Sequence, residues 1–251
     1  MRGAERKNLG SVRVVVFDLD GTLIDSSRDL AAAVNATRAR LGLGPHSLAR
    51  VMSYIGHGAR ELMRKAVGDE IPVIADSRLD EVLGWFREYY SAHLLDETRA
   101  YPGVREALES LSNGAQRPRC LDEGRTPGSA PTASGAAISL AVLTNKPIQF
   151  TTEILRGLDL ARYFRFIYGQ YSFPTLKPDP TVLLHILSQC GATPREALMV
   201  GDSDTDVLTA RNAGAWAAGV TYGLSSDSLR ATPPDVLLDS LTALPPLLSH
   251  L

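Results

Sequence analysis

The sequence contains few cysteines and no excess of either charge. Cys120 and Cys190 are too few for a disulfide framework, and they lack the spacing of a zinc site. The chain has 26 lysine and arginine residues against 28 aspartate and glutamate residues, so it offers no strongly basic surface. Nucleic acid is therefore not expected as a partner.

Long apolar runs are also missing from the sequence. No run approaches the ~20 residues that span a bilayer, so we expect no membrane partner. Residues 1–11 carry charges but lack the apolar stretch of a secretory signal. These features predict a reduced protein of the cytoplasm. A composition of 44% hydrophobic and 22% charged residues is typical of a globular chain and excludes a disordered or coiled-coil main body.

Short apolar runs recur along the chain and predict buried β-strands. The first is the β-branched run at residues 12–17, and similar runs follow at residues 138–143, 164–168, 197–200, 215–220 and 236–238. Segments whose apolar residues have helical spacing lie between several of the later runs. Strands that alternate with helices predict an α/β fold built on a doubly wound, Rossmann-like parallel sheet.

Residues 25–98 follow a different pattern. Their apolar residues repeat at helical spacing in four successive groups, and no clear strand interrupts them. We expect an inserted all-helical cap domain at residues 25–98, within a core formed by residues 11–24 and 99–251. Residues 112–137 are rich in Gly, Pro, Ser and Ala, so we expect a flexible surface loop there.

Two acidic motifs follow predicted strands. Asp18 and Asp20 come directly after the first strand, where an open α/β sheet places its ligands. A turn is the alternative for this motif, because Asp and Gly favour turns. The segment 201–206 brings Asp202, Asp204 and Asp206 to the end of another strand, and carboxylates of this kind suit a hard divalent cation such as Mg²⁺. Capping of a helix N-terminus is the alternative for Asp204 and Asp206.

Two further motifs are weak when taken singly. Thr144 and Asn145 follow a third strand, where a hydroxyl and backbone N–H groups suit phosphate oxygens, although the same residues are common in turns. Lys177 lies in a Lys-Pro-Asp-Pro segment ahead of a predicted helix. Its ammonium group is either a surface charge or a charge that neutralises phosphate.

The order and spacing of the four motifs resemble the haloacid dehalogenase superfamily. The resemblance covers nearly the whole chain, apart from the N-terminal tail and residues 112–137. It implies a Rossmann-like core with a mobile cap, and the insert at residues 25–98 matches the helical type of cap. The long loop departs from the pattern of the superfamily, whose usual members have a shorter connection at this point.

The resemblance also implies a role for each motif residue. Asp18 corresponds to the nucleophile and Asp20 to the general acid and base. Mg²⁺ would be held by the carboxylates of Asp18 and Asp202 and by the backbone carbonyl of Asp20. Asp206 would orient the metal site. Thr144 and the backbone near Asn145 would bind phosphate oxygens, and Lys177 would balance the charge of the nucleophile and the phosphate.

The presence of Asp20 indicates phosphoester chemistry, since dehalogenases of this superfamily lack the second acid. In the insert, Gly56, His57, Gly58 and Arg60 resemble a Gly-x-Gly segment in the caps of phosphoglycolate phosphatases. His57 or Arg60 could meet a substrate carboxylate; alternatively, the glycines only end one helix and open the next. The resemblance therefore implies a phosphatase of a small phosphorylated metabolite, most similar to the phosphoglycolate phosphatases, and we expect a monomer or homodimer. The rivals are phosphatases of sugar phosphates, nucleotides or pyrophosphate, a hexose-phosphate mutase, and a non-catalytic binding module.

Overall fold

A six-stranded sheet forms the centre of the computed structural model, which describes residues 9–56, 58–68, 70–71, 74–113 and 138–249. The strand order is β5-β4-β1-β6-β7-β8, and all neighbouring strands are parallel. The strands are β1 (Val14–Phe17), β4 (Ser139–Pro147), β5 (Phe166–Gln170), β6 (Ala197–Gly201), β7 (Trp216–Val220) and β8 (Val236–Leu238). Each overlaps one of the six predicted runs, so the expected Rossmann-like sheet is confirmed.

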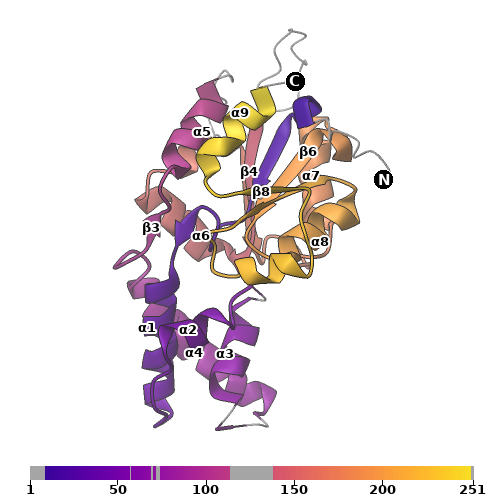
Figure 1. Cartoon of the computed structure of the whole chain (residues 1–251). Helices are drawn as coiled ribbons and strands as arrows, with labels where there is room; N and C mark the ends of the chain where they lie inside the picture. Colours follow the sequence, from indigo (N-terminus) through magenta and orange to yellow (C-terminus); the bar gives the residue numbers. More distant parts are fainter. Residues whose placement is uncertain (1–8, 57, 69, 72–73, 114–137, 250–251) are drawn as a thin grey trace, which may run out of the picture.

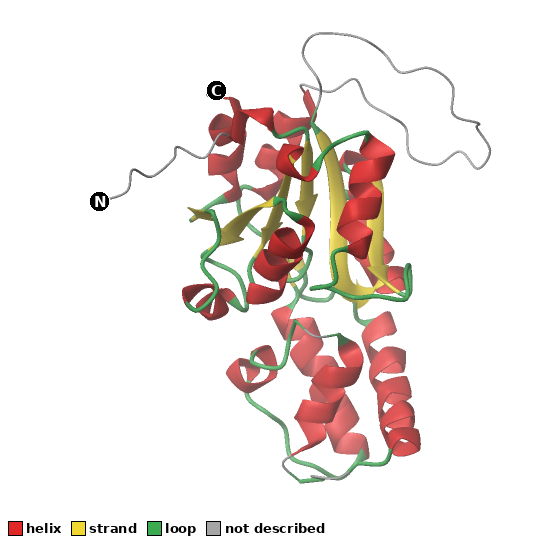
Figure 2. Cartoon of the chain, turned by 90° about the vertical axis from the view of Figure 1, so that its right-hand side faces the viewer, coloured by secondary structure: helices red, strands yellow, loops and turns green. Residues whose placement is uncertain are grey.

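Helices cover both faces of this sheet (Figure 2). One face packs against α5 (Val104–Asn113), α6 (Ile148–Gly157) and α9 (Leu244–Ser249), and the other packs against α7 (Thr181–Cys190) and α8 (Asp204–Ala213). Alternate residues of β1 enter the two apolar layers, with Val15 and Phe17 on one side and Val14 and Val16 on the other. Burial on both faces explains why the strand is apolar without interruption.

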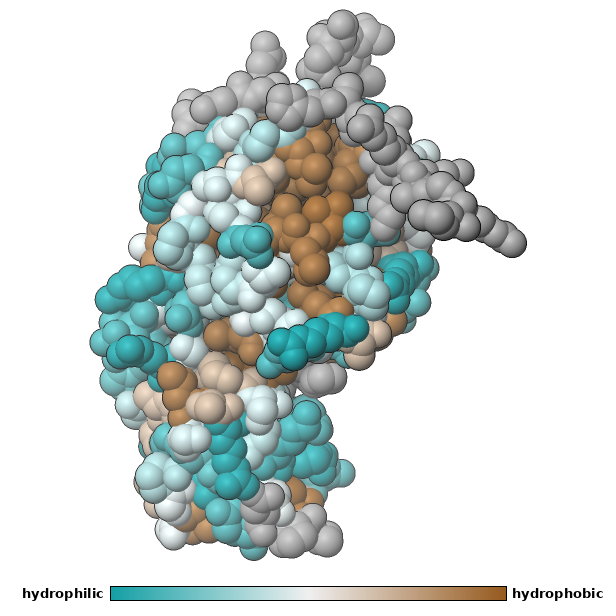
Figure 3. Space-filling model, viewed as in Figure 1, coloured by the Kyte–Doolittle hydropathy of each residue, from teal (hydrophilic) through white to brown (hydrophobic). Residues whose placement is uncertain are grey.

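The helical insert, residues 25–98, forms the lower part of the molecule in Figure 1. It consists of α1 (Ser27–Arg40), α2 (Leu48–Met52), α3 (Ala59–Gly68) and α4 (Asp76–Ala92), which pack their apolar side chains together. The space-filling view shows a mostly hydrophilic surface over these helices on the face presented (Figure 3). No helix in the described ranges has the length and apolar character to cross a membrane.

Two short strands that the sequence analysis missed connect the insert to the sheet. β2 (Ile24–Asp25) pairs antiparallel with β3 (Arg99–Ala100), so the two chain crossings lie side by side (Figure 1). Two residues are too few to show a period-two pattern. Short 3₁₀ helices complete the fold, at Leu9–Ser11, Ala161–Tyr163, Pro194–Glu196, Ser226–Arg230 and Leu241–Ala243. Of the expected surface loop, residues 112–113 belong to α5, and residues 114–137, with Cys120, lie outside the described residues.

Asp29 joins the two segments that connect the insert to the sheet. Its buried carboxylate accepts hydrogen bonds from the backbone N–H of Glu97 at 3.0 Å and of Thr98 at 2.9 Å. The hydroxyl of Thr98 donates a further bond at 2.7 Å. A carboxylate in the first turn of α1 thus holds the segment that leads into β3, and hydrogen bonds to a charged acceptor are among the stronger ones.

Replacing Asp29 by alanine is therefore expected to lower the free energy of unfolding by about 2–4 kcal/mol, because it leaves three donors without their acceptor, and the two donors of Thr98 are buried. Urea unfolding followed by circular dichroism measures this change. Asp227→Ala is the control, since that side chain is 90% exposed and should alter stability by less than ~0.5 kcal/mol. A loss at Asp29 no larger than at Asp227 would contradict the assignment.

Candidate active site

The acidic motifs meet because their strands are neighbours in the sheet. β1 lies between β4 and β6, although more than one hundred residues separate it from either along the chain. Parallel strands end at the same edge, so Asp18 and Asp202 emerge side by side. β4 continues beyond the predicted end at Leu143, and its register shifts between Leu143 and Pro147. Residues 144–146 therefore lie in the irregular last part of this strand.

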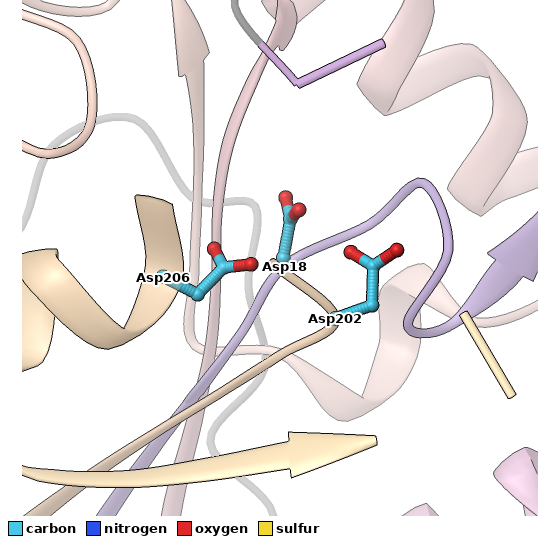
Figure 4. A group of neighbouring side chains, drawn as sticks. All are labelled: Asp18, Asp202 and Asp206. Carbon is cyan, nitrogen blue, oxygen red and sulfur yellow. The ribbon is translucent and has the colours of Figure 1, made fainter. Parts of the chain in front are cut away.

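Three carboxylates converge at this edge. One oxygen atom from each of Asp18, Asp202 and Asp206 lies within 4.8 Å of the others. Asp18 follows β1, Asp202 follows β6 and Asp206 comes from the first turn of α8 (Figure 4). Asp202 and Asp206 are nearly inaccessible to solvent, and the side chain of Asp18 is 13% exposed. This group of carboxylates is able to hold a divalent cation, because such ions prefer oxygen ligands.

Lys177 compensates part of this negative charge. Its Nζ atom lies 2.9 Å from Asp18 Oδ1 and 2.5 Å from Asp206 Oδ1. Burial alone would lower the pKa of the lysine, but the charges of Asp18 and Asp206 outweigh burial and raise it. Lys177 is therefore a fixed cation. When all three aspartates are ionised, the cluster of Asp18, Asp202, Asp206 and Lys177 therefore carries more negative than positive charge.

Burial and the excess negative charge raise the pKa values of two of the aspartates. Burial raises the pKa of Asp18 to about 6, even though Lys177 opposes the shift. Burial also raises the pKa of Asp202, and the charges of Asp206 and Asp18 add to the effect. Carboxylates with such shifts need a proton or a cation at this position. The donor set and its charge fit a divalent metal ion.

Asp206 has a structural role as well as its place in the cluster. Its second oxygen accepts hydrogen bonds from the backbone N–H of Ser203 at 3.1 Å and from the hydroxyl of Ser203 at 2.7 Å. Together with the bond that the Ser203 hydroxyl accepts, these contacts form a capping box at the start of α8. The capping alternative is therefore confirmed for Asp206, which also lies in the carboxylate cluster. Asp204 lies on the same turn and is not part of the cluster.

Glycines allow the backbone to approach Asp202 closely. Gly21 has a φ of +83°, and a Cβ atom there would lie 2.1 Å from Asp202 Oδ2. A Cβ atom on Gly223 would lie 2.1 Å from Asp202 Cβ. The carboxylate is fixed by the backbone N–H of Ser225, which donates to Oδ2 at 2.8 Å. These positions exclude any side chain without rearrangement of the acidic cluster.

The carboxylate of Asp20 has two partners outside the cluster, Ser26 and Lys146. Its Oδ1 accepts a 2.5 Å hydrogen bond from the Ser26 hydroxyl. Lys146 Nζ donates to both carboxylate oxygens, at 3.0 and 3.1 Å, and also to the hydroxyl of Tyr90 at 2.6 Å. Ser26 precedes α1, but its side chain makes no capping bond and instead contacts Asp20. The contacts of Lys146 and Tyr90 were not predicted.

Thr144 and Asn145 lie beside Asp18 and Lys177 in one cavity. The side chain of Asn145 is occupied by backbone groups, because its oxygen accepts from Lys177 N–H at 2.9 Å and its amide donates to the Lys177 carbonyl at 3.1 Å. It therefore fixes the position of Lys177. A ligand in the cavity would meet the Thr144 hydroxyl and backbone groups of this segment.

The insert closes the cavity from the opposite side. Gly56 and Gly58 line it, and the Asn145 amide donates to the Gly56 carbonyl at 3.1 Å. Arg60 does not line the cavity: its guanidinium pairs with Asp76 at 2.9 Å and with Asp80, both on α4. The expectation that Arg60 could reach a substrate is not supported, because these carboxylates hold it on the surface. His57 lies outside the described residues.

A variant of Lys177 tests the charge balance of the cluster. Ionised Asp18 destabilises the metal-free fold as pH rises from about 4 through its pKa of about 6, and Lys177 limits this loss. Lys177→Met is expected to lower the free energy of unfolding by about 3–5 kcal/mol at about pH 8, and by less at about pH 5, where Asp18 is protonated. Thermal unfolding without divalent ions measures both, with Lys65→Met on α3 as control. An equal loss at the two pH values would show that Lys177 does not interact with an ionised Asp18.

Comparison with known proteins identifies the family. A model described as haloacid dehalogenase-like hydrolase matches residues 12–214. Phosphoglycolate phosphatase 1 of Pseudomonas aeruginosa is 37% identical over 238 residues, which cover 93% of this chain and 79% of that protein. The phosphoglycolate phosphatase of Agrobacterium fabrum is 33% identical over 235 residues, which cover 94% of this chain and 91% of that protein.

A solved structure agrees with these relatives. The crystal structure of a predicted phosphoglycolate phosphatase from Haemophilus somnus has a TM-score of 0.82 and 28% identity, and the match covers 94% of this chain and 98% of that chain. The resemblance drawn from the four motifs is thus confirmed across the sheet and the insert. The chain belongs to the haloacid dehalogenase-like hydrolase family.

Proposed function

We propose that the protein is a Mg²⁺-dependent phosphomonoester hydrolase that acts through an aspartyl-phosphate intermediate. The observation that carries the proposal is that two carboxylates on one short segment have different hydrogen-bond and charge partners. Asp18 faces Asp202 and the cation of Lys177, whereas Asp20 is held separately by Lys146 and Ser26. Two carboxylates in different environments suit the distinct roles of nucleophile and general acid or base.

The reaction has two steps. In the first, an oxygen of Asp18 attacks phosphorus, the bond to the leaving oxygen breaks, and the carboxyl proton of Asp20 passes to that oxygen. In the second, Asp20 takes a proton from water as the water attacks phosphorus, and the bond between phosphorus and Asp18 breaks. Inorganic phosphate leaves, and both carboxyl groups return to their starting forms.

Mg²⁺ would be held by the carboxylates of Asp18 and Asp202 and by the backbone carbonyl of Asp20, with Asp206 orienting this set. When bound, the metal offsets the repulsion between the attacking carboxylate and the phosphate dianion. Thr144 and the backbone near Asn145 would bind the phosphate oxygens. Lys177 would balance the charge of the nucleophile and the phosphate in the transition state.

The domain division follows from these roles. We assign residues 11–24 and 99–251 to the catalytic core and residues 25–98 to a helical cap domain. The cap contributes mainly apolar groups to the cavity, namely Leu30, Ile55, Ala59, Leu62 and Phe86. Such a lid keeps bulk water from the reacting phosphate and strengthens the electrostatic interactions in the core. We place this enzyme in the cytoplasm.

The substrate that we favour is 2-phosphoglycolate, which is hydrolysed to glycolate and phosphate. The relatives at 33–37% identity carry the name phosphoglycolate phosphatase. The lining of the cavity supports a small substrate: among the described cap residues that line it, Tyr90 is the only one with a polar side-chain group. A sugar phosphate would leave several buried hydroxyls unpaired against this wall, which disfavours it as substrate and disfavours a hexose-phosphate mutase.

Substitution of the nucleophile tests the proposed function. Asp18→Asn should reduce turnover of 2-phosphoglycolate by about 10⁴-fold or more and leave the fold intact, because the amide cannot form the covalent intermediate. Phosphate release measures turnover, and circular dichroism checks folding. The wild-type enzyme should also prefer 2-phosphoglycolate over a sugar phosphate, a nucleotide, pyrophosphate and p-nitrophenyl phosphate in the presence of Mg²⁺.

The outcomes of this panel are distinct. A preference for another ester would replace the substrate and keep the phosphatase. Absence of turnover of every ester by the wild-type protein, with Mg²⁺ present, would favour a non-catalytic binding module. Full activity of Asp18→Asn would overturn the proposed mechanism.

Metal binding should depend on pH in a defined direction. Protons compete with Mg²⁺ for Asp18, whose pKa is raised to about 6, and for Asp202, whose pKa is also raised. The increase in melting temperature on addition of MgCl₂ is therefore expected to be large at about pH 8 and small at about pH 5. Asp202→Asn should abolish the increase at about pH 8. A Mg²⁺ effect that is independent of pH would place the ion elsewhere.

A further inference from the structure

Lys146 is a buried cation whose contacts connect the two parts of the molecule. Its side chain is 4% exposed, and its ammonium group contacts Asp20 in the core and the Tyr90 hydroxyl on α4. Burial alone would lower the pKa of Lys146, but the negative charge of Asp20 and the contact with Tyr90 raise it. The ammonium group also lies 4.7 Å from the centre of the Tyr90 ring.

Tyr90 is held in place by the packing of the insert and the core. Its ring stacks on Phe86 at 5.5 Å and meets Phe150 of α6 edge-on at 5.3 Å. It is 1% exposed, and burial raises the pKa of its hydroxyl to about 12, so the hydroxyl stays neutral. The position of the Tyr90 hydroxyl therefore depends on how α4 packs against the core, and Lys146 transmits this position to Asp20.

We propose that Lys146 and Tyr90 are positioning residues that fix the carboxyl group of Asp20 for proton transfer, and that docking of the helical insert completes this arrangement. The proposal rests on the proposed function and extends it to two residues outside the four motifs. Lys146 acts through Asp20, and Tyr90 acts through Lys146.

The geometry separates this role from simple charge compensation. Lys146 donates to both oxygens of Asp20 while Ser26 donates to Oδ1, so the plane of the carboxyl group is fixed from two directions. A single ion pair would leave that plane free to rotate. A proton donor must point at the leaving oxygen when the bond to phosphorus breaks, so an orientational error reduces transfer of the proton more than it reduces binding.

The test compares leaving groups in three variants. Lys146→Met removes the ammonium group and keeps a long apolar chain, and Tyr90→Phe removes only the hydroxyl and keeps the ring contacts. Tyr89→Phe is the matched control, because it removes a hydroxyl from the same helix at a residue whose ring stacks on His93 instead. Thermal unfolding and circular dichroism establish that each variant is folded.

Three substrates are compared by kcat/KM, which reports the steps up to formation of the phosphoenzyme. 2-Phosphoglycolate and ethyl phosphate release an alkoxide that needs a proton, whereas p-nitrophenyl phosphate releases a stable phenolate. Lys146→Met should lower kcat/KM for both alkyl phosphates by about 10²-fold and for p-nitrophenyl phosphate by less than about tenfold. Tyr90→Phe should show the same selectivity with a loss of about tenfold. Tyr89→Phe should match the wild-type enzyme with all three substrates.

Other results overturn the inference. An equal loss with alkyl and aryl phosphates would make Lys146 a structural residue only. A loss confined to 2-phosphoglycolate, with ethyl phosphate unaffected, would instead assign Lys146 to the substrate carboxylate. A Tyr90→Phe variant with the same kinetics as the wild-type enzyme would show that the cap does not help to position Asp20. If the wild-type protein hydrolyses none of the three esters, the proposed function fails, and this failure is distinct from the others.

Discussion

The crowding of negative charge at one edge of the sheet is the constraint on which the site depends. Asp18, Asp202 and Asp206 bring their oxygens together away from solvent, with Lys177 as the cation built into the cluster. Such a group repels itself and is desolvated, so the surrounding structure must hold it in place. The two apolar layers on either side of β1 provide that rigidity, and the remaining charge leaves a place for a divalent ion.

The topology of the sheet explains how residues far apart along the chain assemble this cluster. β1 is central, and its neighbours β4 and β6 supply the other polar residues from the same edge. Asp18, Asp202 and residues 144–146 therefore begin at strand ends whose positions are set by hydrogen bonds along the sheet, while Asp206 comes from α8 and Lys177 from the segment between β5 and α7. The backbone at Gly21 and Gly223 lies close to Asp202 and limits the positions that its side chain can take. Neither glycine can carry a side chain in this arrangement.

Much of this could be read from the sequence, and the misses have a physical reason. The strands were visible because burial on both faces makes them apolar throughout, and the motifs were visible because they follow strand ends. Lys146 and Tyr90 were not, since their partners are distant in sequence and a buried tyrosine on α4 follows the same spacing as a core residue. The ion pairs of Arg60 with Asp76 and Asp80 were not predicted either, since these carboxylates lie 16 and 20 residues away along the chain.

The insert and the core contribute opposite kinds of surface to the cavity. The core presents charges that are held by hydrogen bonds, and the insert presents apolar side chains and few polar groups. The two meet through adjacent residues at the end of β4: Asn145 donates to the Gly56 carbonyl, and Lys146 donates to the Tyr90 hydroxyl. The same Asn145 fixes Lys177, while Lys146 fixes Asp20. Movement of the insert would therefore disturb the contacts of both cations at once, so exclusion of water and alignment of the charged groups are coupled through one short segment.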